Sequence, residues 1–60
     1  MRNFKKILIV EDNLEMRTLV ADALKKEGYR VSLAKDGMAM MQALQTERID
    51  LVLLDIMLPG

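Results

Sequence analysis

Acidic side chains stand at two points of the sequence where a hydrophobic run ends. Glu11 and Asp12 follow the run 7–10, and Asp55 follows the run 51–54. Carboxylates gathered without a basic neighbour repel one another, and a hard cation such as Mg²⁺, held by a few oxygens and water, relieves that repulsion. The three residues therefore predict an acidic metal pocket, if the fold brings the two runs together.

Each carboxylate also has a structural explanation. Glu11 and Asp12 precede a predicted helix, where acidic and capping residues are favourable by about 0.3–1 kcal/mol, so a capping role explains these two equally well. Asp55 follows four apolar residues of a buried strand and loses solvation there, although it could instead cap the next turn. Asp36 and Asp50 are interpreted as loop residues.

Hydrophobic patterns predict five elements that would position these side chains. They are a strand at 6–10, a helix at 14–27, a strand at 30–34, a helix at 38–47 and a strand at 50–54. Continuous apolar runs, as in the first and last strands, are typical of strands covered on both faces. The middle strand alternates loosely between apolar and polar residues, which is typical of a strand that is exposed on one side or lies at an edge.

The first helix has recognisable ends and a predicted buried stripe. Asn13 is the predicted N-cap, and Gly28 is predicted to lie just past the C-terminus. The spacing i, i+3, i+4, i+7, i+8 predicts one apolar stripe, formed by Met16, Leu19, Val20, Ala23 and Leu24.

This β-α-β-α-β alternation predicts an α/β fold with a parallel sheet, in which the first strand lies between the second and the third (order 2-1-3). A ligand site is then expected beyond the carboxyl ends of the first and third strands. The third strand would be an uncovered hydrophobic edge, which soluble proteins avoid. We therefore expect a twofold homodimer that completes the sheet through this edge.

Composition narrows the possible functions. The 60 residues contain no Cys and no His, which excludes disulfides and argues against a zinc cluster. Nine basic and nine acidic residues cancel, so no basic field attracts nucleic acid or an anionic membrane. The apolar runs are far shorter than the roughly 18 residues of a membrane helix. A soluble cytoplasmic chain, without direct binding to nucleic acid or membrane, is expected.

The cluster Met38, Met40 and Met41 permits two interpretations. Methionine can form a soft-metal or promiscuous binding surface, but at helical spacing it more often fills a core. Core filling is the expectation here.

Three stretches of the chain together resemble the receiver domain of two-component response regulators, which has a flavodoxin-like fold. They are Ile-Leu-Ile-Val-Glu-Asp-Asn at 7–13, the Asp36-Gly37 turn, and Asp-Leu-Val-Leu-Leu-Asp-Ile-Met-Leu-Pro-Gly at 50–60. The resemblance covers the whole chain. It implies that Asp55 accepts a phosphoryl group from a phosphohistidine on a sensor histidine kinase. It also implies that Glu11, Asp12, Asp55 and the backbone carbonyl of Met57 hold Mg²⁺.

The resemblance is limited to the N-terminal half of such a domain, residues 1–60 here. The full receiver sheet has the order 2-1-3-4-5. The family's Ser or Thr after the fourth strand and Lys after the fifth, which contact the phosphoryl group and the acceptor, have no counterpart among these residues. We expect a phosphoacceptor module rather than an enzyme, with weak Mg²⁺ binding and slow or undetectable phosphorylation. The alternative is a half-domain scaffold that dimerises and does not signal.

Other phosphate chemistries fit the sequence less well. A haloacid dehalogenase also places a nucleophilic Asp after a hydrophobic strand, but it needs a second Asp two residues later, where this chain has Met57. Dinucleotide and P-loop binding need glycines after the first strand, and the turn there is acidic and has none.

Overall fold

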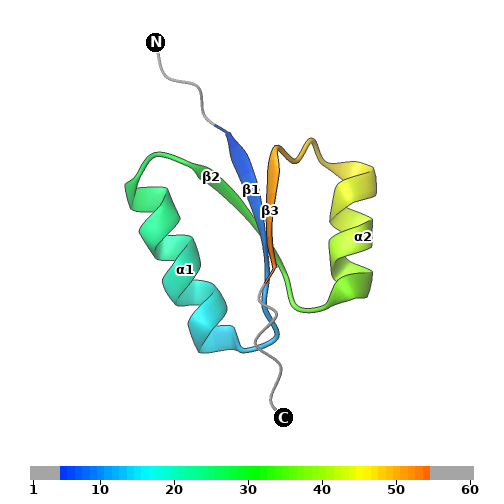
Figure 1. Ribbon diagram of the computed structural model, residues 1–60, viewed down its shortest axis with the longest axis horizontal. Helices are drawn as coiled ribbons and strands as arrows, with labels where there is room; N and C mark the ends of the chain where they lie inside the picture. The colour runs from blue at the N-terminus through cyan, green and yellow to red at the C-terminus, as the bar shows by residue number, and fades with distance from the viewer. Residues whose placement is uncertain (1–4, 55–60) are drawn as a thin grey trace.

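A three-stranded sheet lies between two helices in the computed structural model, which describes residues 5–54 (Figure 1). The elements in chain order are β1 (Lys6–Val10), α1 (Leu14–Lys26), β2 (Arg30–Ala34), α2 (Gly37–Thr46) and β3 (Leu51–Leu54). Asp55 and Met57 lie outside the described residues.

The sheet is parallel and has the order β2-β1-β3, as the alternation of elements predicts. In the register of β1 with β3, Ile7 lies opposite Leu51 and Val10 opposite Leu54. The two helices cover opposite faces of the sheet (Figure 1). This is the arrangement of a doubly wound α/β fold, in which consecutive right-handed crossovers run in opposite directions from a central strand.

Strand β1 supplies the core on both faces of the sheet. Leu8 and Val10 pack with Ala34 and Ala43 on the α2 side, whereas Ile7 and Ile9 pack with Ala21 on the α1 side. Leu8 is fully buried. The continuous apolar run of β1 thus reflects a strand with protein on both sides.

Helix termini are fixed by side chains that the sequence places next to them. Asn13 caps α1 as predicted, because its Oδ1 accepts a hydrogen bond from the Met16 backbone N–H at 2.9 Å. Gly28 follows the helix with φ at 96°, a conformation that a side chain disfavours. Asp36 is more than a loop residue: its Oδ1 accepts from the Ala39 N–H at 2.9 Å and caps α2.

The buried face of α1 differs from the predicted stripe. Ala21 is 2% exposed and Val20 and Leu24 pack beside it, but Leu19 is 64% exposed. The small Ala21 side chain lets the helix backbone approach β1 and β2. The helix is therefore turned so that Leu19 and Ala23 face away from the buried side, whereas Met16, although 46% exposed, lies on the same side as Val20, toward Ile9.

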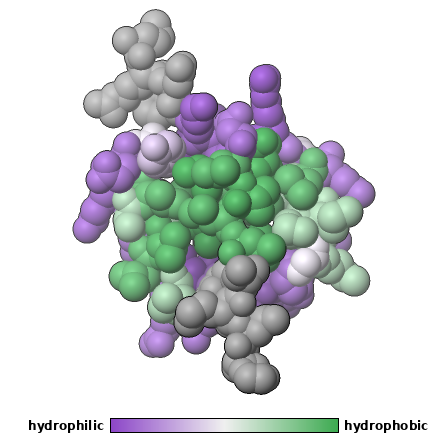
Figure 2. Space-filling view, in the orientation of Figure 1, coloured by the Kyte–Doolittle hydropathy of each residue, from purple (hydrophilic) through white to green (hydrophobic). Residues whose placement is uncertain are grey.

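Strand β3 is the open edge of the described sheet. Leu51 and Leu54 are each more than half exposed and Leu53 is 37% exposed. No Cα atom of β3 comes within 8 Å of a Cα atom in either helix. A hydrophobic patch accordingly spreads between the two helices, over the place where β3 runs (Figure 2).

A cluster of polar side chains at the N-terminal ends of β1 and β3 connects β3 to the rest of the fold. Asp50 accepts a hydrogen bond from the Lys6 backbone N–H through Oδ2 at 2.8 Å, and its own N–H donates to the Lys6 carbonyl at 2.9 Å. Lys6 Nζ lies 2.7 Å from Glu47 Oε1, which also accepts from Ser32 Oγ at 2.9 Å. Asp50 therefore fixes the start of β3 against β1, beyond the loop role expected of it.

Among residues 5–54, no helix is both long enough and apolar enough to span a bilayer.

Candidate functional site

The carboxyl ends of β1 and β3 lie side by side. Val10 is opposite Leu54 in the register of the two strands, and each is the last residue of its strand. Glu11 and Asp12 follow β1 directly, and Asp55 follows Leu54 in the sequence. The fold thus brings together the two points where the sequence places acidic residues. In a doubly wound sheet this is where ligands bind.

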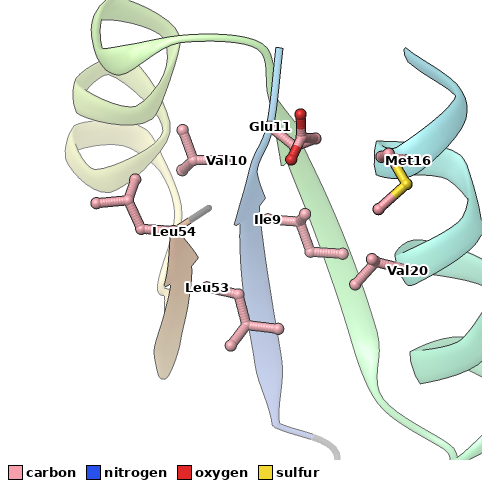
Figure 3. Close-up of a pocket in the computed structure, with 7 residues that line it drawn as sticks. All are labelled: Ile9, Val10, Glu11, Met16, Val20, Leu53 and Leu54. Atoms are coloured by element: carbon pink, nitrogen blue, oxygen red, sulfur yellow. The ribbon is translucent and has the colours of Figure 1, made fainter. Parts of the chain in front are cut away.

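Glu11 is a largely buried carboxylate, only 9% exposed. Its backbone N–H donates to the Ala34 carbonyl at 3.0 Å, and its Oε2 accepts from the Asn13 N–H at 2.9 Å. Figure 3 shows the Glu11 side chain at the end of β1 on the side of α1. Donation by a backbone N–H stabilises an ionised carboxylate at a helix N-terminus. Glu11 therefore shapes the turn as well as contributing charge to it.

Arg17 anchors the same turn from α1, and sequence reasoning missed it. Its Nη1 donates to the Glu11 backbone carbonyl at 2.7 Å. The Arg17 backbone N–H also donates to the Asn13 carbonyl, in the first turn of the helix. A basic residue one turn into a helix is usual on a solvated surface, so no motif distinguishes it. Only the fold shows that its guanidinium reaches back to the residue before Asp12.

Asp12 is the accessible carboxylate of the pair. It is exposed, and its side chain accepts no hydrogen bond from any described residue. Residues 5–54 contain no group of three Asp, Glu, His or Cys side chains able to hold a metal ion. Glu11 and Asp12 nonetheless offer carboxylate oxygens, which Mg²⁺ prefers, and a hexacoordinate ion keeps several waters. The donor set thus fits Mg²⁺ if further oxygens come from beyond Leu54.

An apolar groove of about 330 Å³ borders the acidic turn. Its lining consists of Ile9, Val10, Glu11, Met16, Val20, Leu53 and Leu54 (Figure 3). Ile9 and Leu53 lie on the side of α1, whereas Val10 and Leu54 point to the other face (Figure 3). Apolar walls beside carboxylates lower the local dielectric and strengthen electrostatic interactions with a bound cation.

Comparison with known proteins assigns the chain to a family. Residues 7–60 match the model of the response regulator receiver domain. The chain therefore belongs to the receiver domain family, whose members are the phosphoryl-accepting modules of two-component signalling and generally bind Mg²⁺ for phosphorylation. The resemblance seen in the sequence is confirmed.

Individual relatives span several kinds of protein. The chain is 43% identical to sporulation initiation phosphotransferase F of Bacillus subtilis over 93% of its length. It is 44% identical over 92% to the alkaline phosphatase synthesis transcriptional regulatory protein PhoP of the same organism, and 41% identical over 98% to the CAI-1 autoinducer sensor kinase/phosphatase CqsS of Vibrio cholerae. The match spans 45%, 23% and 9% of these proteins, respectively. No solved structure gives a significant match.

Proposed function

We propose that this chain accepts a phosphoryl group on Asp55, with Mg²⁺ held by Glu11, Asp12, Asp55 and the backbone carbonyl of Met57. The observation that carries the proposal is the pairing of Val10 with Leu54. It sets the acidic turn after β1 beside the end of the strand that precedes Asp55. Membership of the receiver family supports the roles of these residues.

The proposal gives each of these residues a chemical role. The Asp55 carboxylate is the nucleophile: its oxygen forms the new P–O bond while the P–N bond of a phosphohistidine breaks and the imidazole leaves. Mg²⁺, when bound, neutralises charge between the phosphoryl oxygens and the attacking carboxylate. Asp12 supplies an accessible carboxylate oxygen for that ion. Glu11 adds negative charge and is fixed by the Asn13 N–H.

The partner that this chemistry requires is a sensor histidine kinase carrying a phosphohistidine. One relative, CqsS, is itself named a sensor kinase/phosphatase. A phosphodonor of this kind also supports a cytoplasmic location, where ATP supplies the kinase.

The sixty-residue chain by itself is expected to react slowly. Phosphoryl transfer depends on positioned cationic and hydrogen-bonding groups, and the loss of one such donor commonly costs about 10²–10³ in rate. The family's later Ser or Thr and its later Lys have no counterpart in these residues. Mg²⁺ binding should be weak for the same reason, because fewer groups fix the acidic side chains.

Intact-mass spectrometry tests the proposal. The chain is incubated with Mg²⁺ and a small acyl-phosphate donor, and the fraction carrying one phosphoryl group is followed over time. Asp55→Asn should abolish the adduct, and Asp12→Asn should raise the Mg²⁺ concentration needed. The matched control is Asp22→Asn, a change of the same chemistry at an exposed position on α1. An adduct that persists in Asp55→Asn would disprove the assignment.

A second candidate function is self-assembly through the β3 edge without signalling. The observation that favours it is the exposure of Leu51, Leu53 and Leu54 on the strand that has no neighbour on its outer side in the described sheet. The four residues of β3 carry no charge, so two copies can pair there without electrostatic repulsion. An isologous pairing of identical edges closes as a homodimer. This assembly is compatible with phosphorylation but does not need it.

A further inference from the structure

Two methionines on α2 face away from the protein. Met38 is 76% exposed and Met41 is 53% exposed. Residues three apart on a helix share a face, so the two thioethers lie on the same side of α2. The opposite side of the helix carries Ala39 and Ala43, which pack on the sheet. The sequence-based expectation that these methionines fill the core is therefore wrong for this pair.

Met40, between them in sequence, is in a different environment. It packs against the cluster of Leu8, Val10, Ala34 and Ala43 on the α2 side of the sheet. The core-filling interpretation is correct for this methionine. Within four residues the helix thus carries two exposed thioethers and one shielded thioether. The three have the same intrinsic chemistry and differ only in their surroundings.

Exposure determines how readily a thioether is oxidised. A sulfur lone pair attacks the terminal oxygen of the hydroperoxide, and the S–O bond forms as the O–O bond breaks. The departing hydroxide or alkoxide takes the proton of the sulfur-bound hydroxyl, which leaves the sulfoxide and water or an alcohol. The sulfur is oxidised by two electrons and the peroxide is reduced. The product is a polar sulfoxide, and sulfoxide reductases restore the thioether. No base or metal from the protein is needed, so access to the sulfur controls the rate.

We propose that Met38 and Met41 form an oxidant-reactive pair, whose conversion to sulfoxides by hydroperoxides makes the outer face of α2 more polar while the fold persists. Beside the pair, Gln42 and Gln45 are exposed and already polar, and Leu44 is 42% exposed. Oxidation of the pair therefore makes two of the three exposed large apolar side chains of α2 polar and leaves Leu44. Before oxidation, the flexible methionine side chains can adapt to the surface of a partner. After oxidation, burying these side chains against a partner requires the desolvation of a polar sulfoxide, which costs free energy.

The contacts that hold α2 in place do not involve either sulfur. The helix begins at the Asp36 cap, whose Oδ1 accepts from the Ala39 N–H. It ends at Thr46, and the next residue, Glu47, is held by Ser32 and Lys6. Its buried side is formed by Ala39, Met40 and Ala43. Sulfoxides at positions 38 and 41 stay in water and leave these contacts unchanged.

Peptide mapping after limited hydrogen peroxide treatment tests the proposal. Met38 and Met41 should be oxidised about as fast in the native chain as in chain unfolded in urea, whereas native Met40 should react at least roughly threefold more slowly than unfolded Met40. The doubly oxidised protein should keep its circular dichroism spectrum, with a Tm within about 4 °C of the starting value. Equal native rates at all three positions, or unfolding once the pair is oxidised, would overturn the proposal.

Variants separate the pair from the rest of the chain. In Met38→Leu/Met41→Leu the fast phase of oxygen uptake at α2 should disappear and Met40 should keep its slow rate. In Met40→Leu the fast phase should remain. If the fast phase survives the double substitution on α2, the exposed pair is not the reactive site and the proposal fails.

Discussion

Arg17 shows how a single side chain can fix the geometry of the acidic turn. Its guanidinium donates to the carbonyl of Glu11, the residue whose carboxylate the turn partly buries. Because that peptide group directly precedes Asp12, its orientation affects where the Asp12 side chain is presented. A charged donor to a backbone carbonyl contributes about 1.5–3 kcal/mol when it is well shielded, and less when it is partly exposed.

Arg17→Ala should therefore destabilise the chain by about 1 kcal/mol and weaken Mg²⁺ binding. Urea denaturation gives the free energy of unfolding, and Mg²⁺ titration of the phosphorylation rate gives the second effect. Arg48→Ala is the control, because Arg48 is exposed and has no hydrogen bond or ion pair with any described residue. Equal losses in the two variants would show that the contact with Glu11 contributes nothing.

The partly exposed ion pair between Glu47 and Lys6 makes the stability of the fold depend on pH in the acidic range. The hydrogen bonds from Lys6 and Ser32 lower the pKa of Glu47 from its ordinary value of 4.5. A lowered folded-state pKa stabilises the protein above the unfolded-state value, and this stabilisation is lost as the pH falls through the folded-state pKa. Below about pH 4.5, Tm should fall more steeply in the native chain than in Glu47→Gln. Parallel Tm profiles for the two proteins would contradict this.

At the scale of elements, Ala21 sets how closely α1 approaches the sheet. It is 2% exposed and packs with Ile7 and Ile9, whereas Ala23 on the same helix is exposed. Ala21→Leu should overpack the interface and destabilise the chain by about 1–3 kcal/mol. Ala23→Leu should change the free energy of unfolding by less than about 0.5 kcal/mol. Chemical denaturation of both variants measures this, and a costly Ala23→Leu with a neutral Ala21→Leu would place the helix in another orientation.

The elements also show what local sequence can and cannot predict. The run 7–10, the Asn13 cap and the alternation of elements depend on neighbouring residues, and they predict the sheet order correctly. The rotation of α1 depends on which side chain fits the surface of the sheet, so a count of apolar residues favoured Leu19 over Ala21. The bond from Lys6 to Asp50 joins residues 44 apart in sequence, and only the fold brings them together.

In the candidate site, too, features set by neighbouring residues could be predicted, whereas a contact made only in the folded chain could not. The positions of Glu11 and Asp12 could be predicted because they follow from the end of an apolar run and from strand order. The contact from Arg17 could not be predicted, since a surface arginine carries no distinctive spacing. The roles of Asp55 and Met57 remain proposals that rest on family membership and on the register of β1 with β3.

At the scale of the whole molecule, the open β3 edge makes association the main question. If two copies pair through β3, Leu51→Lys/Leu53→Lys should shift the chain from dimer to monomer, because charges on an edge strand block pairing. Native mass spectrometry and sedimentation equilibrium measure the shift. Leu19→Lys is the matched control, since Leu19 is 64% exposed on the outer side of α1. A wild-type chain that stays monomeric at high concentration would exclude this dimer.

Chemical mapping of the modified carboxylate tests the proposal that Asp55 is the phosphoryl acceptor beside the acidic turn. After reaction with an acyl-phosphate donor and Mg²⁺, borohydride reduces an aspartyl phosphate to homoserine, which peptide sequencing by mass spectrometry locates. Homoserine is expected at position 55 alone, and none is expected when Mg²⁺ is chelated. Modification at Glu11, Asp12 or another carboxylate, or modification at position 55 that is independent of Mg²⁺, would contradict it.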